Sequence, residues 1–74
     1  MQELFFELVR VAIGKEVSLS HSPSAKEWQK LYDMAERQAL LGVCFAGVKR
    51  LGKQGQLPPV ELYYQWLAVA TQIQ

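Results

Sequence analysis

The sequence predicts an all-α fold, a small bundle of about four helices in a single domain spanning residues 1–74. Apolar residues recur at helical spacing in four segments, and glycine or proline lies at most of their borders. No segment shows the period-two alternation of a β-strand. Half of the chain is hydrophobic and one fifth is charged. This composition excludes a disordered tail, because disorder requires low hydrophobicity and high net charge.

The first predicted helix runs from about Glu3 to Ile13. Its apolar residues occupy two adjacent faces, formed by Leu4, Leu8 and Val11 and by Phe5, Val9 and Ala12. The remaining polar stripe is narrow and consists of Glu3, Glu7 and Arg10. Such a narrow stripe predicts a helix that is buried on most sides. Gly14 follows the last apolar residue and suits the left-handed position after a helix.

A serine-rich connector from Lys15 to Pro23 leads to the second predicted helix, and we expect Val17 and Leu19 to hold it on the core. Ser24 and Glu27 have the spacing of a capping box, with Ser24 as the N-cap. An alternative register places Ser22 at the N-cap and Pro23 at the first helical position. The helix runs to about Gln38, and its apolar stripe comprises Trp28, Leu31, Tyr32, Ala35 and Ala39.

The segment from Leu40 to Leu51 is apolar on all sides until Lys49 and contains Gly42 and Gly47. Glycine inside a helix costs about 1 kcal/mol relative to alanine, so its presence predicts a close helix–helix approach or a break. We expect a break near Leu40–Gly42, followed by a central helix that ends at Leu51 with Gly52 in the left-handed position. A single continuous helix through this region is the alternative.

The fourth predicted helix starts at Pro58–Pro59, with Pro59 at the first helical position. A wide apolar face is formed by Leu62, Tyr63, Trp66, Val69, Ala70 and Ile73. The pattern continues to Gln74 without a capping residue, so we expect the chain to be the N-terminal fragment of a longer protein. Because apolar residues occupy more than one face, this helix carries the candidate interface, formed by Tyr63, Tyr64, Leu67, Ala70 and Ile73.

The sequence predicts no catalytic, cofactor-binding or metal-binding residue, and no enzymatic activity for this chain alone. Asp33 is the single aspartate, and no P-loop, dinucleotide fingerprint or zinc spacing is present. His21 lies among serines, but a nucleophilic triad also needs an orienting group and an oxyanion hole. Cys44 has apolar neighbours, which predicts a buried and inert thiol.

Charge and hydropathy restrict the expected partners and location. The formal net charge is +1, and the only local basic excess, Lys49, Arg50 and Lys53, is interpreted as solvation of a helix end. We therefore do not expect nucleic acid as a partner. The N-terminus lacks a basic region and a cleavage site, which excludes a secretory signal. The longest apolar run, Ala39 to Val48, is far shorter than the ~20 residues that span a bilayer. We expect a cytoplasmic protein without a membrane partner.

The order of these features resembles a known family. The helix Glu3-Leu-Phe-Phe-Glu-Leu-Val-Arg10, the Ser/Pro loop, Glu27-Trp28, Ala35-Glu-Arg-Gln-Ala-Leu-Leu-Gly42, and Pro58-Pro59 before a Trp-bearing helix follow one another along the chain. This order is similar to the N-terminal helical region of uncharacterised, bacterial nucleotidyltransferase-like proteins. In that family a Gly-Ser motif and paired aspartates come later and bind metal and nucleotide. None of that pattern occurs here, so no catalytic residue is carried over.

The resemblance implies a non-catalytic domain that packs on or supports a downstream catalytic domain of the same protein. A stand-alone helical protein–protein interaction module is the alternative, and the partner in either case could be another copy. A third hypothesis is a helix-turn-helix nucleic-acid binder with its turn near Leu40–Gly42. The apolar helix that follows disfavours it, because a recognition helix needs polar side chains for base edges.

Overall fold

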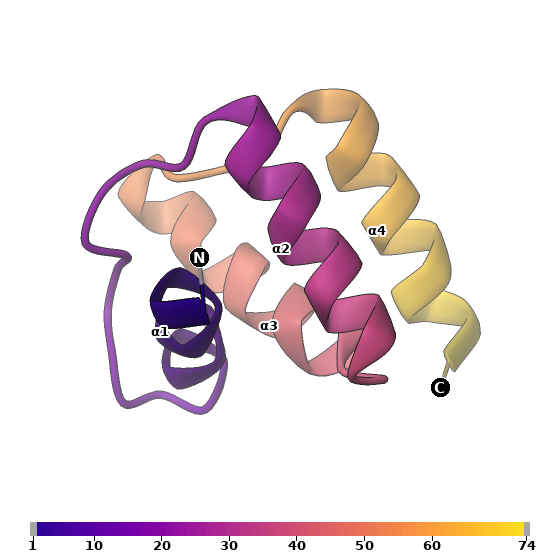
Figure 1. Ribbon diagram of the computed structural model, residues 1–74, viewed down its shortest axis with the longest axis horizontal. Helices are drawn as coiled ribbons and strands as arrows, with labels where there is room; N and C mark the ends of the chain where they lie inside the picture. The colour runs from indigo at the N-terminus through magenta and orange to yellow at the C-terminus, as the bar shows by residue number, and fades with distance from the viewer. Residues whose placement is uncertain (1, 74) are drawn as a thin grey trace.

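The computed structural model describes residues 2–73, and these form four α-helices without a strand. The elements are α1 (Gln2–Ala12), α2 (Ala25–Arg37), α3 (Leu41–Leu51), a 3₁₀ turn η1 (Gly52–Gln54) and α4 (Val60–Ile73). Helix α3 is central and packs against α1, α2 and α4, while α2 passes in front of it (Figure 1). The predicted all-α bundle of about four helices is confirmed.

One apolar core joins all four helices. Its largest fully enclosed side chains are Trp28 and Trp66, whose rings meet edge-on with centroids 6.2 Å apart. The described part of the chain buries no polar or charged residue in this core. The core comprises Leu4, Phe5, Leu8, Val11, Leu19, Trp28, Leu31, Tyr32, Ala35, Leu41, Cys44, Phe45, Val48, Leu51, Leu62, Trp66 and Ala70.

Helix α1 ends as predicted, with Gly14 in the left-handed conformation at φ 87°. The amide of Lys15 donates to the carbonyl of Arg10 and that of Gly14 to Val11, which is the Schellman arrangement. Helix α1 is less buried than predicted, because Phe6 and Ile13 are exposed. Arg10 is exposed as well, so the solvent-facing stripe of α1 is broader than its polar stripe.

Helix α2 begins in the predicted register. Ser24 is the N-cap, and the reciprocal bonds of the capping box with Glu27 are both present, which rules out the Ser22 register.

For the connector before α2, only half of the prediction is confirmed. Leu19 is buried, and its amide donates to Oε1 of Gln56 at 2.9 Å, but Val17 is 70% exposed. The polar bond to Gln56 fixes the connector, so a second apolar contact is not needed.

The predicted break between the second and third helices is confirmed, and the continuous helix is wrong. Ala39 adopts a left-handed conformation with φ 58°, and the amide of Leu40 donates to the carbonyl of Ala35 at 2.7 Å. Together with the bond from the amide of Ala39 to the carbonyl of Glu36, this bond repeats the Schellman arrangement, with alanine in the position where glycine is usual. The prediction that Ala39 extends the apolar stripe is also wrong, because it lies past the helix end and is exposed.

The end of α3 differs from the prediction. Gly52 keeps a right-handed conformation with φ −56°, and the chain continues into η1. Gly55, at φ 75°, takes the left-handed position instead, and the amide of Gln56 donates to the carbonyl of Leu51. Leu57 packs against Gly52, within 3.3 Å of the position of an added Cβ. Helix α4 begins at Val60, one residue after the predicted first helical position at Pro59.

Gly47 confirms the predicted close approach of helices. A Cβ added there would lie 2.9 Å from the carbonyl oxygen of Leu8 and 3.3 Å from the Cβ of Ala12, so α1 packs directly on the backbone of α3. Gly42 has no such role, because nothing lies within 4 Å of its added Cβ.

Within residues 2–73, no helix is long and apolar enough to cross a membrane.

Candidate interaction surface

Helix α4 has one side that is firmly anchored in the core. Leu62, Trp66 and Ala70 are buried there at helical spacing. The indole Nε1–H of Trp66 donates to the carbonyl oxygen of Leu41 at 2.9 Å, and Tyr32 meets the Trp66 ring edge-on with centroids 5.3 Å apart. These contacts fix the rotation of α4 about its axis, and so determine which residues it presents outward.

The outward side of α4 carries a stripe of apolar residues. Val60 is 69% exposed, Tyr64 63% and Leu67 38%, and their spacing of four and three residues places them on one side of a helix. We call these three residues the α4 stripe. Leu57, in the loop before the helix, is also exposed. Single exposed apolar residues are ordinary, but several in one row can mark an interaction site.

The structure places the five predicted interface residues differently. Tyr64 and Leu67 lie in the α4 stripe, while Tyr63 is half-buried and its ring packs against Phe45 with centroids 5.4 Å apart. Ala70 is a correction, since it is only 8% exposed and belongs to the core because it lies one turn after Trp66. The side chain of Ile73 lies outside the described residues.

Sequence reasoning missed Val60, although the signal was present four residues before Tyr64. The predicted apolar face of this helix begins at Leu62, so Val60, which directly follows Pro59 at the predicted first helical position, was not part of it. The helix is nearly uncharged, since Glu61 is its one charged residue. Gln65, beside the stripe, donates to the hydroxyl of Tyr32 at 3.5 Å. The α4 stripe therefore offers apolar contact without a charge pattern of its own.

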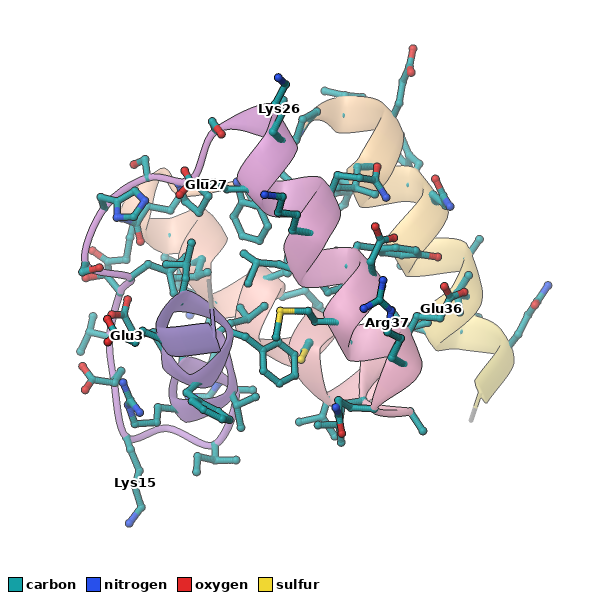
Figure 2. The ribbon with its side chains drawn as sticks, in the orientation of Figure 1. Glu3, Lys15, Lys26, Glu27, Glu36 and Arg37 are labelled. Atoms are coloured by element: carbon teal, nitrogen blue, oxygen red, sulfur yellow. The ribbon has the colours of Figure 1, made fainter. Side chains whose placement is uncertain are left out.

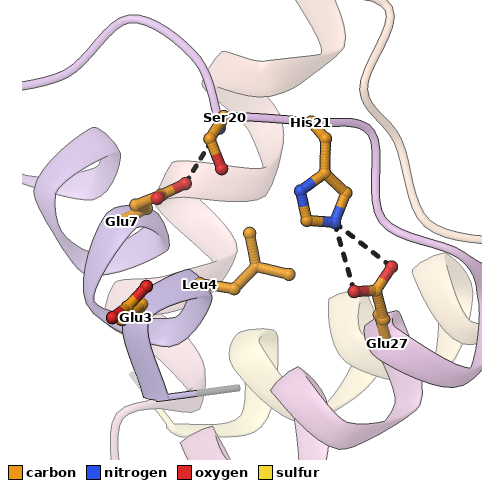
Figure 3. A pocket seen from close by; sticks show the side chains of 6 residues that line it. All are labelled: Glu3, Leu4, Glu7, Ser20, His21 and Glu27. Carbon is orange, nitrogen blue, oxygen red and sulfur yellow. Dashed lines mark hydrogen bonds and ion pairs between the residues drawn. The ribbon is translucent and has the colours of Figure 1, made fainter.

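A second candidate site is a small hollow of about 150 Å³ between the connector and the starts of α1 and α2. Figure 3 shows Glu3 and Glu7 on α1 facing His21 and Glu27 across Leu4. Nε2 of His21 lies 3.1 Å from Oε2 of Glu27, so the carboxylate is the partner of the imidazole. This geometry gives no support to a nucleophilic role for a serine beside His21, which the sequence does not predict either.

Two carboxylates of this hollow, those of Glu7 and Glu27, hold the connector. The amide of Ser20 donates to Oε1 of Glu7 at 2.8 Å, and that of Ser24 donates to Oε1 of Glu27 at 2.9 Å. The bond from the Ser24 amide, followed by that from His21, lowers the pKa of Glu27. These bonds tie the connector to α1 and α2, which is a structural role. Across residues 2–73, no three His, Cys, Asp or Glu side chains gather closely enough to hold a metal ion.

Cys44 is buried in α3, as predicted. Loss of solvation on burial raises the pKa of its thiol to about 11. Since the thiolate is the reactive form, this shift favours an unreactive thiol. Its inertness remains a prediction for a labelling experiment.

A third candidate is an apolar groove of about 280 Å³ between α1 and the end of α2. Its lining is uncharged and contains the flexible side chain of Met34 and the exposed ring of Phe6. The complete lining is Phe5, Phe6, Val9, Met34, Gln38 and Leu40. The groove has no polar group that would orient a small molecule other than Gln38, so its chemistry identifies no ligand class.

The outer side of α3 bears on the helix-turn-helix hypothesis. Helices α2 and α3 are joined by only three residues, which suits that motif. However, the exposed residues in the first two turns of α3 are Val43 and Ala46. Neither carries a hydrogen-bonding side chain, whereas base recognition in the major groove requires such groups. The geometry therefore gives no support to sequence-specific recognition by α3.

No family model, curated protein or solved structure matches this sequence significantly. The resemblance to nucleotidyltransferase-like proteins consequently remains a prediction.

Proposed function

We propose that this chain is a non-catalytic, cytoplasmic helical domain that acts by binding another protein through the α4 stripe. The observation that carries the proposal is the row of Val60, Tyr64 and Leu67 on a helix whose opposite side is locked into the core. The resemblance supports one form of the proposal, in which the partner is the catalytic domain of a nucleotidyltransferase-like protein.

The α4 stripe has the composition of a small binding surface. Tyrosine is enriched at the energetically important positions of interfaces, and charged residues are depleted from interface centres. The stripe places Tyr64 between two aliphatic residues without an intervening charge. Because α4 is held by the Trp66 hydrogen bond and by core packing, the stripe is presented in a fixed orientation, which reduces the entropy lost on binding.

The size of the stripe indicates what kind of partner it can hold. The exposed fractions of Val60, Tyr64 and Leu67 add up to about 1.7 side chains. Since burying one such side chain contributes ~1.5–3 kcal/mol, burying the whole stripe would contribute roughly 2.5–5 kcal/mol to the free energy of binding. Association of two free proteins costs about 4–15 kcal/mol in lost translational and rotational freedom. A partner tethered in the same polypeptide meets an effective concentration on the order of millimolar, which removes much of this cost.

This comparison favours a partner in the same polypeptide over a freely diffusing one. A second copy or a separate protein would need further contacts, for which Leu57 and the edge of Tyr63 lie close to the stripe along the chain. The stand-alone interaction module therefore remains the second form of the proposal. In this form the partner is a separate polypeptide, whereas in the first form it is a domain of the same polypeptide.

Photo-crosslinking in the cells that produce the protein tests the proposal. A benzophenone amino acid replaces Tyr64 in one variant and Lys30, on the exposed side of α2, in the control. We expect one dominant crosslink from position 64, either within the polypeptide or to one partner, and its loss when Leu67→Glu is added. Equal crosslinking from both positions, or a product insensitive to Leu67→Glu, would contradict the proposal.

A further inference from the structure

The end of α3 and the following turn form a positively charged segment. Lys49, Arg50 and Lys53 are all exposed, and Gln54 beside them is exposed as well. The sequence contains no acidic residue between Glu36 and Glu61. This segment therefore has no carboxylate of its own to neutralise its three cations.

The packing of α1 on α3 brings Arg50 next to the chain segment that carries a fourth cation. Gly47 lies against Leu8, and Nη1 of Arg50 lies 3.7 Å from the position of an added Cβ on Gly14, just past the end of α1. Lys15 follows Gly14, and Figure 2 shows its side chain extending away from the body of the molecule. The four cations Lys15, Lys49, Arg50 and Lys53 are called the basic surface.

Most of this positive charge is left without a partner. Glu16, the acidic residue next to Lys15, lies 3.6 Å from Nε of Arg10 instead. Within residues 2–73, no carboxylate comes within ion-pairing distance of the basic surface. The C-terminal ends of α1 and α3 each contribute about −0.5 elementary charge, so the helix dipoles offset about one of the four charges. A charge of about +3 is available to a partner.

We infer that the basic surface binds the phosphate backbone of a nucleic acid without reading its base sequence. Exposed lysines act as point charges that contact phosphates without demanding a fixed shape. The preceding outer residues of α3, Val43 and Ala46, supply nothing for base edges. An acidic protein partner would be expected to bury apolar anchors among the charges. The exposed residues from 49 to 54, which carry three of the four cations, are all polar, and the exposed Ile13 and Val17 flank Lys15 alone. This inference revises the expectation that nucleic acid is not a partner, and it does not depend on the α4 stripe.

The number of cations sets the expected binding behaviour. Four phosphate contacts on a DNA duplex give a slope of about −3.6 for the logarithm of the binding constant against that of salt concentration. Raising the salt from ~50 to ~200 mM should then weaken binding by about 150-fold. Non-specific affinity of this kind has dissociation constants of about 10⁻⁴–10⁻⁶ M at physiological salt.

Fluorescence anisotropy with two 20-base-pair DNA duplexes of unrelated sequence tests the inference. The triple variant Lys49→Gln/Arg50→Gln/Lys53→Gln is compared with Lys26→Gln/Lys30→Gln/Arg37→Gln, which removes the same residue types from the exposed side of α2. Circular dichroism verifies that both variants are folded. We expect equal affinity for both duplexes, at least a tenfold loss in the first variant with a shallower salt slope, and less than a twofold change in the second.

Three outcomes would overturn the inference. The first is the absence of duplex binding by the unmodified chain at 50 mM salt. The second is an equal loss of affinity in both triple variants, since the effect would then follow net charge and not the basic surface. The third is binding to polyglutamate or to phosphatidylserine vesicles with no binding to DNA, which would assign the surface to a different anionic partner.

Discussion

Because α1 and α3 are in close contact, one methyl group added at Gly47 is expected to lower the free energy of unfolding. In Gly47→Ala, the new Cβ would lie 2.9 Å from the carbonyl oxygen and 3.1 Å from Cδ1 of Leu8, and 3.3 Å from the Cβ of Ala12. The carbonyl oxygen belongs to a helix and cannot move alone, so α1 must shift away from α3. Overpacking of this kind costs about 1–3 kcal/mol, while replacing glycine in a helix gains about 1 kcal/mol. We expect a net destabilisation of about 1 kcal/mol, with an upper limit of about 2 kcal/mol.

Gly42→Ala is the matched control, because it makes the same chemical change in the same helix. Nothing lies within 4 Å of its added Cβ, so only the gain in helix propensity remains. We expect stabilisation of less than about 1 kcal/mol, since Gly42 is the second residue of α3 and helix ends fray.

Urea denaturation followed by circular dichroism measures both variants. A loss of 1 kcal/mol would also lower the melting temperature by about 4–8 °C in a domain of this size. If Gly47→Ala were as stable as the unmodified chain, α1 and α3 would not approach each other as closely as described. A destabilised Gly42→Ala would equally contradict the open surroundings of that residue.

Three other predictions follow from local geometry. Ala39→Gly should stabilise the protein by about 1 kcal/mol in the same denaturation assay, because the left-handed conformation with φ 58° costs alanine about 1–2 kcal/mol but suits glycine; an unchanged or lower stability would contradict this. The pKa of Glu27 is lowered below its ordinary 4.5 on folding, so its stabilising contribution is present above about pH 4.5 and is lost as the pH falls through the lowered pKa. Glu27→Gln should therefore reduce the acid sensitivity of the melting temperature, and an identical pH profile would argue against it. The pKa of the Cys44 thiol is raised to about 11 by burial, so a thiol reagent at pH 8 should label the native protein much more slowly than the urea-unfolded protein, and equal rates would show that α3 is exposed.

The parts of the fold that the sequence predicts well are those with local causes. The Ser24 capping box and the Gly14 helix end depend on neighbouring residues, so their residue types suffice to locate them. The sequence predicts the left-handed position at Gly52, because this residue follows the last apolar residue of α3. In the structure, the 3₁₀ turn moves the left-handed position to Gly55. Leu57 packs on Gly52, and this contact cannot be predicted from the residues next to Gly52.

Tertiary packing explains the remaining differences. Ala39 fits the apolar stripe of a regular helix, but the chain must reverse at this point so that α3 can enter the centre of the bundle. Similarly, periodicity places Tyr63 and Ala70 together on the broad apolar face of α4, with Tyr64 off its main stripe, and does not divide that face into a buried and an exposed part. The division depends on where α2 and α3 cover the helix, which leaves Tyr64 outside and Ala70 in the core. The basic surface requires the contact of Arg50 with the end of α1, which sequence spacing alone does not contain.

The most direct test of the proposed function is the accessibility of the α4 stripe where the protein does its work. Single cysteines are introduced by Val60→Cys and Tyr64→Cys, with Lys30→Cys on α2 as the control, while native Cys44 is buried. Labelling rates by a thiol reagent are compared between the purified chain and gentle lysates of the cells that produce the protein. We expect positions 60 and 64 to be labelled at least tenfold more slowly in the lysate, with position 30 unchanged. Equal rates in the two preparations at all three positions would contradict the proposed function.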